Sequence, residues 1–255
     1  VDSELHDLIA KDVMVSEGWF DRLVECAKET NADAVTPLTC QKEPLHSEVH
    51  QAGGQVFDDF KAFLDPDAAN PKLVDCHLNQ GEPVACIGSE RRETQCFEFH
   101  CVLIRKSTFD RVGTFDDDLY STKEHIDFSL AIWKSGGRIL MEPRSVVTYL
   151  VPDRSNPLKM ADWPFFVLRW SPQWQRKSLK HFANKWGFEG DDYFAARDKV
   201  LDWRYREGIA KPILRKVPFL GHRHKFQSLG QALLMPIIRA WGRSSVRHHA
   251  KRLNS

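Results

Sequence analysis

The 255-residue sequence contains no apolar run of the ~18 residues that a membrane-spanning helix requires. It has no secretory signal pattern at its start, and because it opens on Val1 rather than Met we expect a fragment or a processed product. A Gly-rich loop of the kind that binds phosphates is also missing, which argues against a nucleotidyltransferase. What remains, 42% apolar and 28% charged residues, is typical of a soluble globular protein.

Cysteine is scarce, and its spacing excludes two common uses. The six cysteines include no C-x-x-C pair and no histidine at zinc-finger spacing, so we do not expect a zinc site from them. Six cysteines are also too few for a disulfide framework in a chain of this length. We therefore expect reduced thiols and a cytoplasmic protein.

Charge is balanced overall but unevenly distributed. Residues 201–255 hold twelve Lys or Arg against two acids, whereas residues 1–200 hold 24 Lys or Arg against 33 acids. This pattern predicts an acidic body with a basic tail that meets an anionic surface.

Strand and helix signals alternate through residue 150. We predict strands at residues 5–10, 34–36, 97–104, 138–141 and 146–150, with Pro37 ending the second strand. We predict helices from an N-cap at Ser16, at residues 107–112 closed by Gly113, and at residues 122–135, and a long irregular loop at residues 41–81. This alternation favours an α/β sheet packed with helices.

Residues beyond 152 have a helical character. Ser171 and Pro172 form an N-cap followed by proline at the first helical position, which predicts a helix ending at Trp186 and Gly187. Residues 191–206 are also predicted to be helical. Residues 226–253 have an amphipathic pattern, which Pro236 interrupts.

Three acidic residues are candidates for chemistry. Asp12 follows a predicted strand at the edge where α/β sheets bind ligands, although the simpler interpretation is that it only starts a turn. Glu124 and Asp127 lie three residues apart on one face of a helix start, where a carboxylate can act as a general base. The alternative is structural, since Ser121 and Glu124 fit a capping box and acids favour the first turn.

Histidines and tryptophans supply weaker candidates. His46 and His50 are four residues apart, as metal ligands on a helix would be, but Gly53 and Gly54 indicate a loop there. Trp163 begins an aromatic stretch that either stacks on sugars or builds a core, and the core is the more common use.

Read in order, these segments resemble the later part of a family 2 glycosyltransferase with the GT-A fold. The resemblance covers roughly residues 5–190. It rests on residues 9–20 (I-A-K-D-V-M-V-S-E-G-W-F) with a D-x-D-like motif, 32–38, 51–54 (Q-A-G-G), 99–113 with Arg105, Phe109 and Gly113 in place, 115–116 (F-D) and 124–128 (E-H-I-D-F).

The resemblance implies roles for particular residues. The D-x-D-like carboxylate, here Asp12, would bind a divalent cation (Mn²⁺ or Mg²⁺) that bridges the diphosphate of a nucleotide-sugar donor, with Lys11 beside it. Asp127 or Glu124 would be the base that activates the acceptor hydroxyl. Candidates on the acceptor side are His100, His125 and Trp163.

The sequence departs from the family pattern at three positions. Ala10 stands at the first carboxylate of the D-x-D-like motif, His125 stands where many members have Asp, and Tyr149 stands at the distal His. The nucleoside-binding half would precede Asp12, so we expect residues 1–255 to bind nucleotide weakly. A catalytically inactive GT-A-like binding module is therefore the alternative to an enzyme.

The predicted fold class is α/β, a partial GT-A-type mixed sheet flanked by helices with a helical C-terminal extension. We expect the glycosyltransferase portion at residues 1–160 and the extension, with its basic amphipathic tail, at 161–255. The expected reaction is sugar transfer to a glycan or glycolipid acceptor in surface polysaccharide synthesis, without nucleic acid as a partner. The tail, residues 226–255, is expected to contact the inner face of a membrane.

Overall fold

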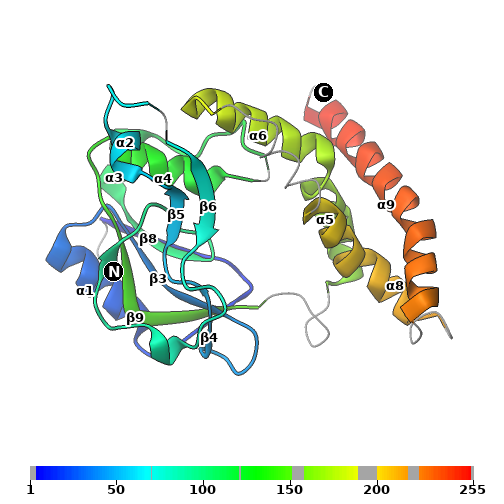
Figure 1. The fold of residues 1–255 in the computed structure, drawn as a ribbon, viewed down its shortest axis with the longest axis horizontal. Coiled ribbons are helices and arrows are strands. Elements are labelled where there is room, and N and C mark those ends of the chain that lie inside the picture. The colour runs from blue at the N-terminus through cyan, green and yellow to red at the C-terminus, as the bar shows by residue number, and fades with distance from the viewer. Residues whose placement is uncertain are drawn as a thin grey trace. The chain divides into compact units, whose positions relative to one another are not determined.

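A computed structural model describes residues 4–69, 71–120, 122–150, 158–188, 200–217 and 224–253. The chain forms two compact units (Figure 1). Unit 1 comprises Val1–Asp116 and Glu124–Val151, and unit 2 comprises Asp117–Lys123 and Pro152–Ser255.

Unit 1 is built on a mixed sheet. Its strands are β1 (Leu5–Ile9), β2 (Val13–Val15), β3 (Ala34–Gln41), β4 (Glu48–Gln51), β5 (Gly54–Phe57), β6 (Leu73–His77), β7 (Arg92–Glu93), β8 (Cys101–Arg105) and β9 (Ile139–Tyr149). Its helices are α1 (Trp19–Thr30), α2 (Phe60–Leu64), the 3₁₀ turn η1 (Val84–Cys86), α3 (Lys106–Val112) and α4 (Glu124–Lys134). The main sheet has the order β1-β8-β3-β9-β2, with β4 paired to β3 and β7 to β9, while β5 and β6 pair separately. Only β3 and β9 run parallel among these pairs.

Helices cover both faces of the main sheet, because successive side chains of its strands are buried on opposite faces. In β8, Cys101 and Leu103 pack with α1, whereas Val102 and Ile104 pack against α4 on the opposite face. Neighbouring strands divide in the same way, since successive side chains of a strand point to opposite faces. Both faces of the sheet are therefore apolar, as a sheet between two helical layers requires.

Pro37 does not end its strand, contrary to the sequence prediction. β3 continues to Gln41, and its register against β9 shifts between Pro37 and Leu38. On the other side, β8 pairs only with Ala34 and Val35, and β4 pairs only from Thr39 onward. Pro37 lies in the gap between these two partners, where the missing N–H removes no ladder hydrogen bond.

β9 is one strand, although two were predicted. Its pairing with β3 skips from Glu142 to Val146, so the residues between them form a bulge opposite the Pro37 irregularity. A bulge absorbs extra residues without ending the strand.

Three further predictions for unit 1 need correction. Residues 41–81 are not one irregular loop, because they contain β4, β5, α2 and β6. The predicted strand at residues 97–104 is reduced to β8. Helix α1 starts after Gly18, whose φ of 67° turns the chain into the helix, and the N–H of Ser16 instead donates to the carbonyl oxygen of Val146 (3.1 Å).

Unit 2 is helical where it is described. It contains η2 (Met160–Asp162), α5 (Trp163–Arg169), α6 (Pro172–Trp186), the π-helical turn η3 (Arg206–Ala210), α8 (Lys211–Arg215) and α9 (His224–Leu253). The predicted limits of α6 are confirmed, with Ser171 Oγ accepting from the N–H of Trp174 and Gly187 closing the helix. Helix α9 continues through Pro236 instead of breaking. The predicted helix at residues 191–206 lies partly outside the described residues, but residues 200–205 are helical.

The predicted fold class is confirmed: unit 1 is a mixed α/β sheet flanked by helices, and the C-terminal part is helical. None of the described helices combines the length and hydropathy that a transmembrane span requires. All six cysteines are free thiols.

Candidate functional site

The turn after β1 carries the predicted donor-side residues. The N–H of Ala10 donates to the carbonyl oxygen of His100 (2.9 Å), and the carbonyl oxygen of Asp12 accepts from the N–H of Leu150 (2.8 Å). Lys11 is exposed and Asp12 is partly exposed. This turn is therefore held between the residue before β8 and the residue after β9.

Residues 97–100 connect this turn with the start of α4. The N–H of Phe97 donates to Ser129 Oγ (3.4 Å), and the ring of Phe99 meets that of His125 edge-on with centroids 6.1 Å apart. The helix begins at Glu124, and the side chain of Asp127 is buried at 4% exposure. One short segment thus contacts both the Ala10–Asp12 turn and the acidic helix start.

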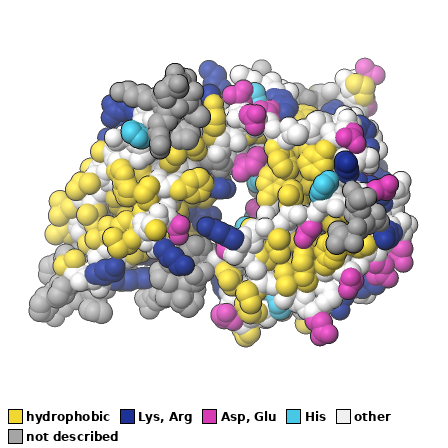
Figure 2. All heavy atoms as spheres, turned by 180° about the vertical axis from the view of Figure 1, so that it is seen from behind, with side chains coloured by type: hydrophobic (Ala, Val, Ile, Leu, Met, Phe, Trp, Pro, Cys, Tyr) yellow, Lys and Arg dark blue, Asp and Glu magenta, His cyan; other side chains and the backbone are white. Residues whose placement is uncertain are grey.

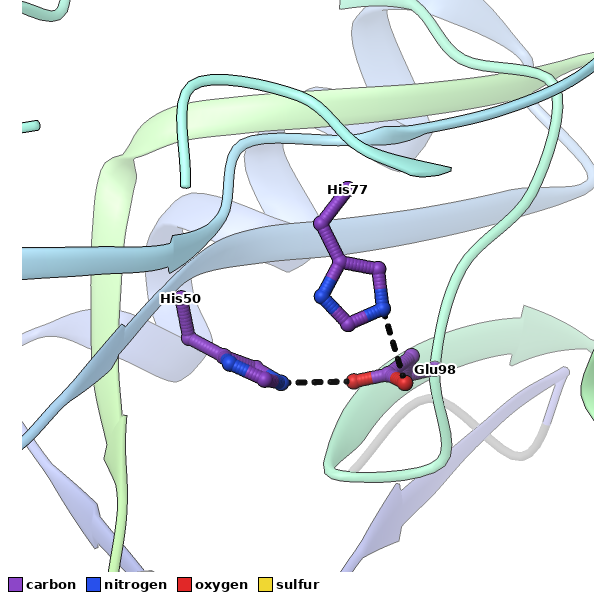
Figure 3. Close-up of side chains that lie close together, drawn as sticks. All are labelled: His50, His77 and Glu98. Carbon is purple, nitrogen blue, oxygen red and sulfur yellow. Dashed lines mark hydrogen bonds and ion pairs between the residues drawn. The ribbon is translucent and has the colours of Figure 1, made fainter. Parts of the chain in front are cut away.

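Glu98 lies within the same segment and gathers three imidazole rings around its carboxylate. Its Oε2 is 2.9 Å from His100 Nε2 and 3.1 Å from His50 Nε2, and its Oε1 is 3.2 Å from His77 Nε2. Figure 3 shows His50 and His77 approaching the two carboxylate oxygens from different parts of the chain. His50 belongs to β4 and His77 ends β6, so the cluster joins both of these strands to the segment before β8.

The cluster is enclosed but accessible to solvent. The exposed side-chain fractions are 12% for His50, 18% for Glu98, 20% for His100 and 27% for His77. The ring of His100 stacks on Tyr149 with centroids 3.9 Å apart. Because Tyr149 pairs with Val13 in β2, the cluster borders the strand that follows Asp12.

Burial and hydrogen bonding act in opposite directions on the cluster. Burial alone would raise the pKa of Glu98, but hydrogen bonds with His100, His50 and His77 hold it well below its ordinary range. Burial lowers the pKa of His50, although its contact with Glu98 acts in the opposite direction. Glu98 is therefore a carboxylate at neutral pH, and His50 resists protonation.

Sequence reasoning found this cluster only in part. It weighed His46 and His50 as helical metal ligands but favoured a loop at these residues. The structure instead has His50 in a strand, and His46 Nδ1 contacts Thr148 Oγ1 at 2.7 Å. His100 was considered only as an acceptor-side residue, and Glu98 and His77 were missed. Within the predicted strand at residues 97–104, Glu98 and His100 would share one face, which offered a signal, although the structure has both residues before the start of β8.

Asp12 is the predicted ligand of the divalent cation. No three-ligand group of His, Cys, Asp or Glu among the described residues includes Asp12, whereas His50, His77 and Glu98 form such a group. A single carboxylate can still hold Mg²⁺ or Mn²⁺ when substrate phosphates and water complete the coordination. Asp12 therefore fits a cation carried by a diphosphate better than one held by the protein alone.

Trp163 belongs to unit 2, whereas the other candidate residues belong to unit 1. It begins α5 and packs against the core formed by Val167, Tyr205 and their neighbours. This contact agrees with the structural use of the aromatic stretch. A role for Trp163 toward an acceptor stays a prediction.

Comparisons with known proteins give a likeness in structure but none in sequence. No protein-family model matches the chain, and no curated protein matches it in sequence. Among solved structures, the chain is similar to the crystal structure of GalNAc-T7 with UDP, GalNAc and Mn²⁺, at 15% identity and a TM-score of 0.44. The match covers 84% of this chain and 42% of that protein, so this chain corresponds to less than half of it.

Proposed function

We propose that this chain is a GT-A-type, family 2-like glycosyltransferase that moves a sugar from a nucleotide-sugar donor to a glycan or glycolipid acceptor in surface polysaccharide synthesis. The observation that carries the proposal is the position of residues 97–100. Their backbone and side chains contact both the Ala10–Asp12 turn and the start of α4, which are more than a hundred residues apart in sequence. These are the two segments for which the resemblance predicts donor binding and catalysis.

The proposed donor side is the turn after β1. Asp12 would contribute one oxygen to a divalent cation bound to the donor diphosphate, and exposed Lys11 would contact the same phosphates. Such a cation offsets the negative charge that develops on the leaving diphosphate. The role of the chain is to hold the donor at this turn, beside the stacked rings of His100 and Tyr149.

The proposed base is Asp127, and Glu124 is the second candidate. Asp127 lies in the first turn of α4 and is buried, which keeps bulk water from its carboxylate. A general base must reach the acceptor hydroxyl, and His100 and His125 are the proposed contacts for that acceptor in unit 1. Ser121, the serine of the capping box in which Glu124 would have a structural role, lies outside the described residues.

The test is sugar transfer from UDP- and GDP-sugars in the presence of Mn²⁺. We expect Asp127→Asn to lower turnover by roughly 10²- to 10⁴-fold, the usual contribution of a general base, while leaving donor affinity largely intact. Asp21→Asn, which changes an exposed acid on α1, is the matched control and should transfer normally. If Asp127→Asn keeps near-normal turnover and Glu124→Gln does not, the base is Glu124.

A catalytically inactive binding module is the second candidate, and Ala10 and Tyr149 favour it. Tyr149 stacks on His100, and its phenol is a weak ligand for a hard cation. In that case the wild-type protein transfers no sugar from any donor, but still binds glycan. This outcome would replace the enzyme proposal.

We further propose that residues 1–160 form the C-terminal portion of the transferase domain and residues 161–255 its extension. Helix α9 would then rest on the inner, cytoplasmic face of a membrane and bring the enzyme to lipid-linked acceptors. Support comes from exposed apolar residues along α9, namely Leu229, Leu233, Ile237 and Trp241. Figure 2 shows apolar side chains exposed over the helices of unit 2.

A further inference from the structure

The cluster around Glu98 has the spacing of a metal site. The ligand atoms of His50, His77 and Glu98 all lie within 4.8 Å of one another, so one ion can contact all three. Tetrahedral ligands at about 2.1 Å from zinc are roughly 3.4 Å apart. His50 Nε2 lies 3.1 Å from Glu98 Oε2 and His77 Nε2 lies 3.2 Å from Glu98 Oε1, so each ring is within a few tenths of an ångström of that value from one oxygen of the carboxylate.

Hydrogen bonds around His50 determine which ring nitrogen carries its proton. Gln41 Nε2 donates to Glu48 Oε1 (2.9 Å), and this orients the amide so that its Oε1 faces His50 Nδ1 at 3.2 Å. An amide oxygen can only accept, so Nδ1 carries the hydrogen. Histidines that bind metals are commonly oriented in this way, with the second nitrogen donating to an oxygen of the protein.

This tautomer leaves two acceptors facing each other. In neutral His50 the lone pair of Nε2 is directed at Glu98 Oε2, which is also an acceptor. The contact is favourable only if a cation is shared there, either a proton on Nε2 or a metal ion.

We propose that His50, His77 and Glu98 bind a divalent transition-metal ion of the zinc class. Imidazole nitrogens favour Zn²⁺ and Co²⁺, whereas Mg²⁺ and Ca²⁺ require oxygen ligands. Three protein ligands with partial exposure leave a coordination position for water, as in open zinc sites. His100, which contacts the same carboxylate and stacks on Tyr149, orients Glu98.

The bound ion would join three parts of unit 1. His50 is in β4, His77 ends β6 and Glu98 precedes β8, so the ion links the small β5–β6 sheet to the main sheet. Binding to the folded state alone raises stability by mass action. This inference concerns metal binding only and stands whether or not the chain transfers sugar.

The test is metal titration of the untagged, chelator-stripped protein. Calorimetry with Zn²⁺ should show one saturable site per chain, and Co²⁺ should give visible d–d absorption that Zn²⁺ displaces. Mg²⁺ should not compete. Zn²⁺ should also raise the melting temperature of the wild-type protein.

Substitutions identify the site. His50→Gln, His77→Gln and Glu98→Gln should each weaken Zn²⁺ binding at least roughly tenfold, the low end of the effect of losing even a supporting group. His6→Gln removes an exposed histidine outside the cluster and should bind like the wild type. Gln41→Leu should weaken affinity while keeping the stoichiometry, because Gln41 positions His50 without contacting the ion.

Three results separate the possibilities. No saturable binding of Zn²⁺ or Co²⁺ by the wild-type protein overturns the proposal, and a lowered melting temperature in Glu98→Gln would then mark a hydrogen-bonded network without metal. Wild-type affinity for Zn²⁺ in both His50→Gln and His77→Gln also overturns the proposal. If Glu98→Gln does not fold, these two histidine variants provide the test. Asp12→Asn should leave Zn²⁺ binding unchanged, so failure of the donor-site proposal is recognised separately.

Discussion

Asp7 is a carboxyl on β1 whose environment opposes its charge. Burial raises its pKa from the ordinary value of 3.8 to about 6. The folded state therefore holds this proton more tightly than the unfolded state. The stability that Asp7 contributes is present below about pH 4 and is lost as the pH rises through 6.

Replacing Asp7 with Asn should remove this loss. We expect Asp7→Asn to raise the free energy of unfolding at pH 7.5 by about 1 kcal/mol. This value is smaller than the full pKa shift implies, because the side chain is partly exposed and its charge is screened by solvent. The gain over the wild type should shrink toward zero at pH 4. Urea denaturation at both pH values measures it, with Asp21→Asn as the exposed control. An equal stability difference at the two pH values would contradict the assignment to Asp7.

At the scale of the element, Glu142 holds the bulge of β9. Its side chain is fully buried, and Oε1 accepts from the backbone N–H and from Nε of Arg144 at 3.0 Å and 2.9 Å. Its Oε2 accepts from Arg91 Nε at 2.6 Å and from Arg144 Nη2 at 2.8 Å. A buried carboxylate with two arginine partners thus stabilises the residues that β3 leaves unpaired.

Glu142→Gln should destabilise unit 1 by about 2–3 kcal/mol, because its charged hydrogen bonds are lost. The loss is limited to this range because both guanidinium groups keep some solvent contact. Burial raises the pKa of Glu142, but hydrogen bonds from Arg144 and Arg91 outweigh it and lower the pKa below 4.5. Its stabilisation is therefore present above pH 4.5 and lost as the pH falls below that value. Chemical denaturation between pH 3 and pH 7 should show the wild type and the variant converging in acid.

The matched control for this element is Glu93→Gln. Glu93 pairs with Arg138 at 2.9 Å, but both side chains are about half exposed. Surface ion pairs contribute little, so this variant should change stability by less than ~1 kcal/mol. A loss as large as that of Glu142→Gln would show that burial is not the deciding factor.

At the scale of the whole molecule, α9 has two apolar faces with different surroundings. Met235 and Ile238 are buried in the core of unit 2, whereas Leu233 and Ile237 are 68% and 65% exposed. Arg239 forms an ion pair with Asp202, because its Nη2 donates to both carboxylate oxygens at 2.6 Å. The exposed stripe, with Arg243 and Arg247 also exposed, is the part of the helix available to an anionic surface.

We expect the protein to co-sediment with anionic liposomes and to be released by salt, since charge attraction is screened. Replacing Leu233 and Ile237 with serine together should abolish binding with little change in melting temperature, because both residues are exposed. Met160→Ser together with Phe165→Ser removes two comparably exposed residues outside α9 and serves as the control. Unchanged liposome binding by the α9 variant would exclude the membrane role of this stripe.

Deleting α9 would not test whether its exposed stripe binds membranes. The helix supplies Met235 and Ile238 to the core of unit 2, so its removal would expose Val167 and Tyr205. Loss of liposome binding would then be inseparable from unfolding.

What the sequence determined by itself was local. The limits of α6 follow from Ser171, Pro172 and Gly187, whose capping and backbone preferences act within a few residues. The end of α3 at Gly113 and the alternation of strands with helices were predictable for the same reason. Membership of an α/β class needs no knowledge of which strands are neighbours.

Tertiary structure decided the features that depend on distant partners. Pro37 stays within β3 because β8 pairs only before it and β4 only after it, so its missing N–H costs no ladder hydrogen bond. The Glu98 cluster likewise assembles His50 and His77 from separate strands of unit 1. Spacing along the chain carries no information about such contacts, since they arise only when β4, β6 and residues 97–100 pack together and bury their polar groups against one another.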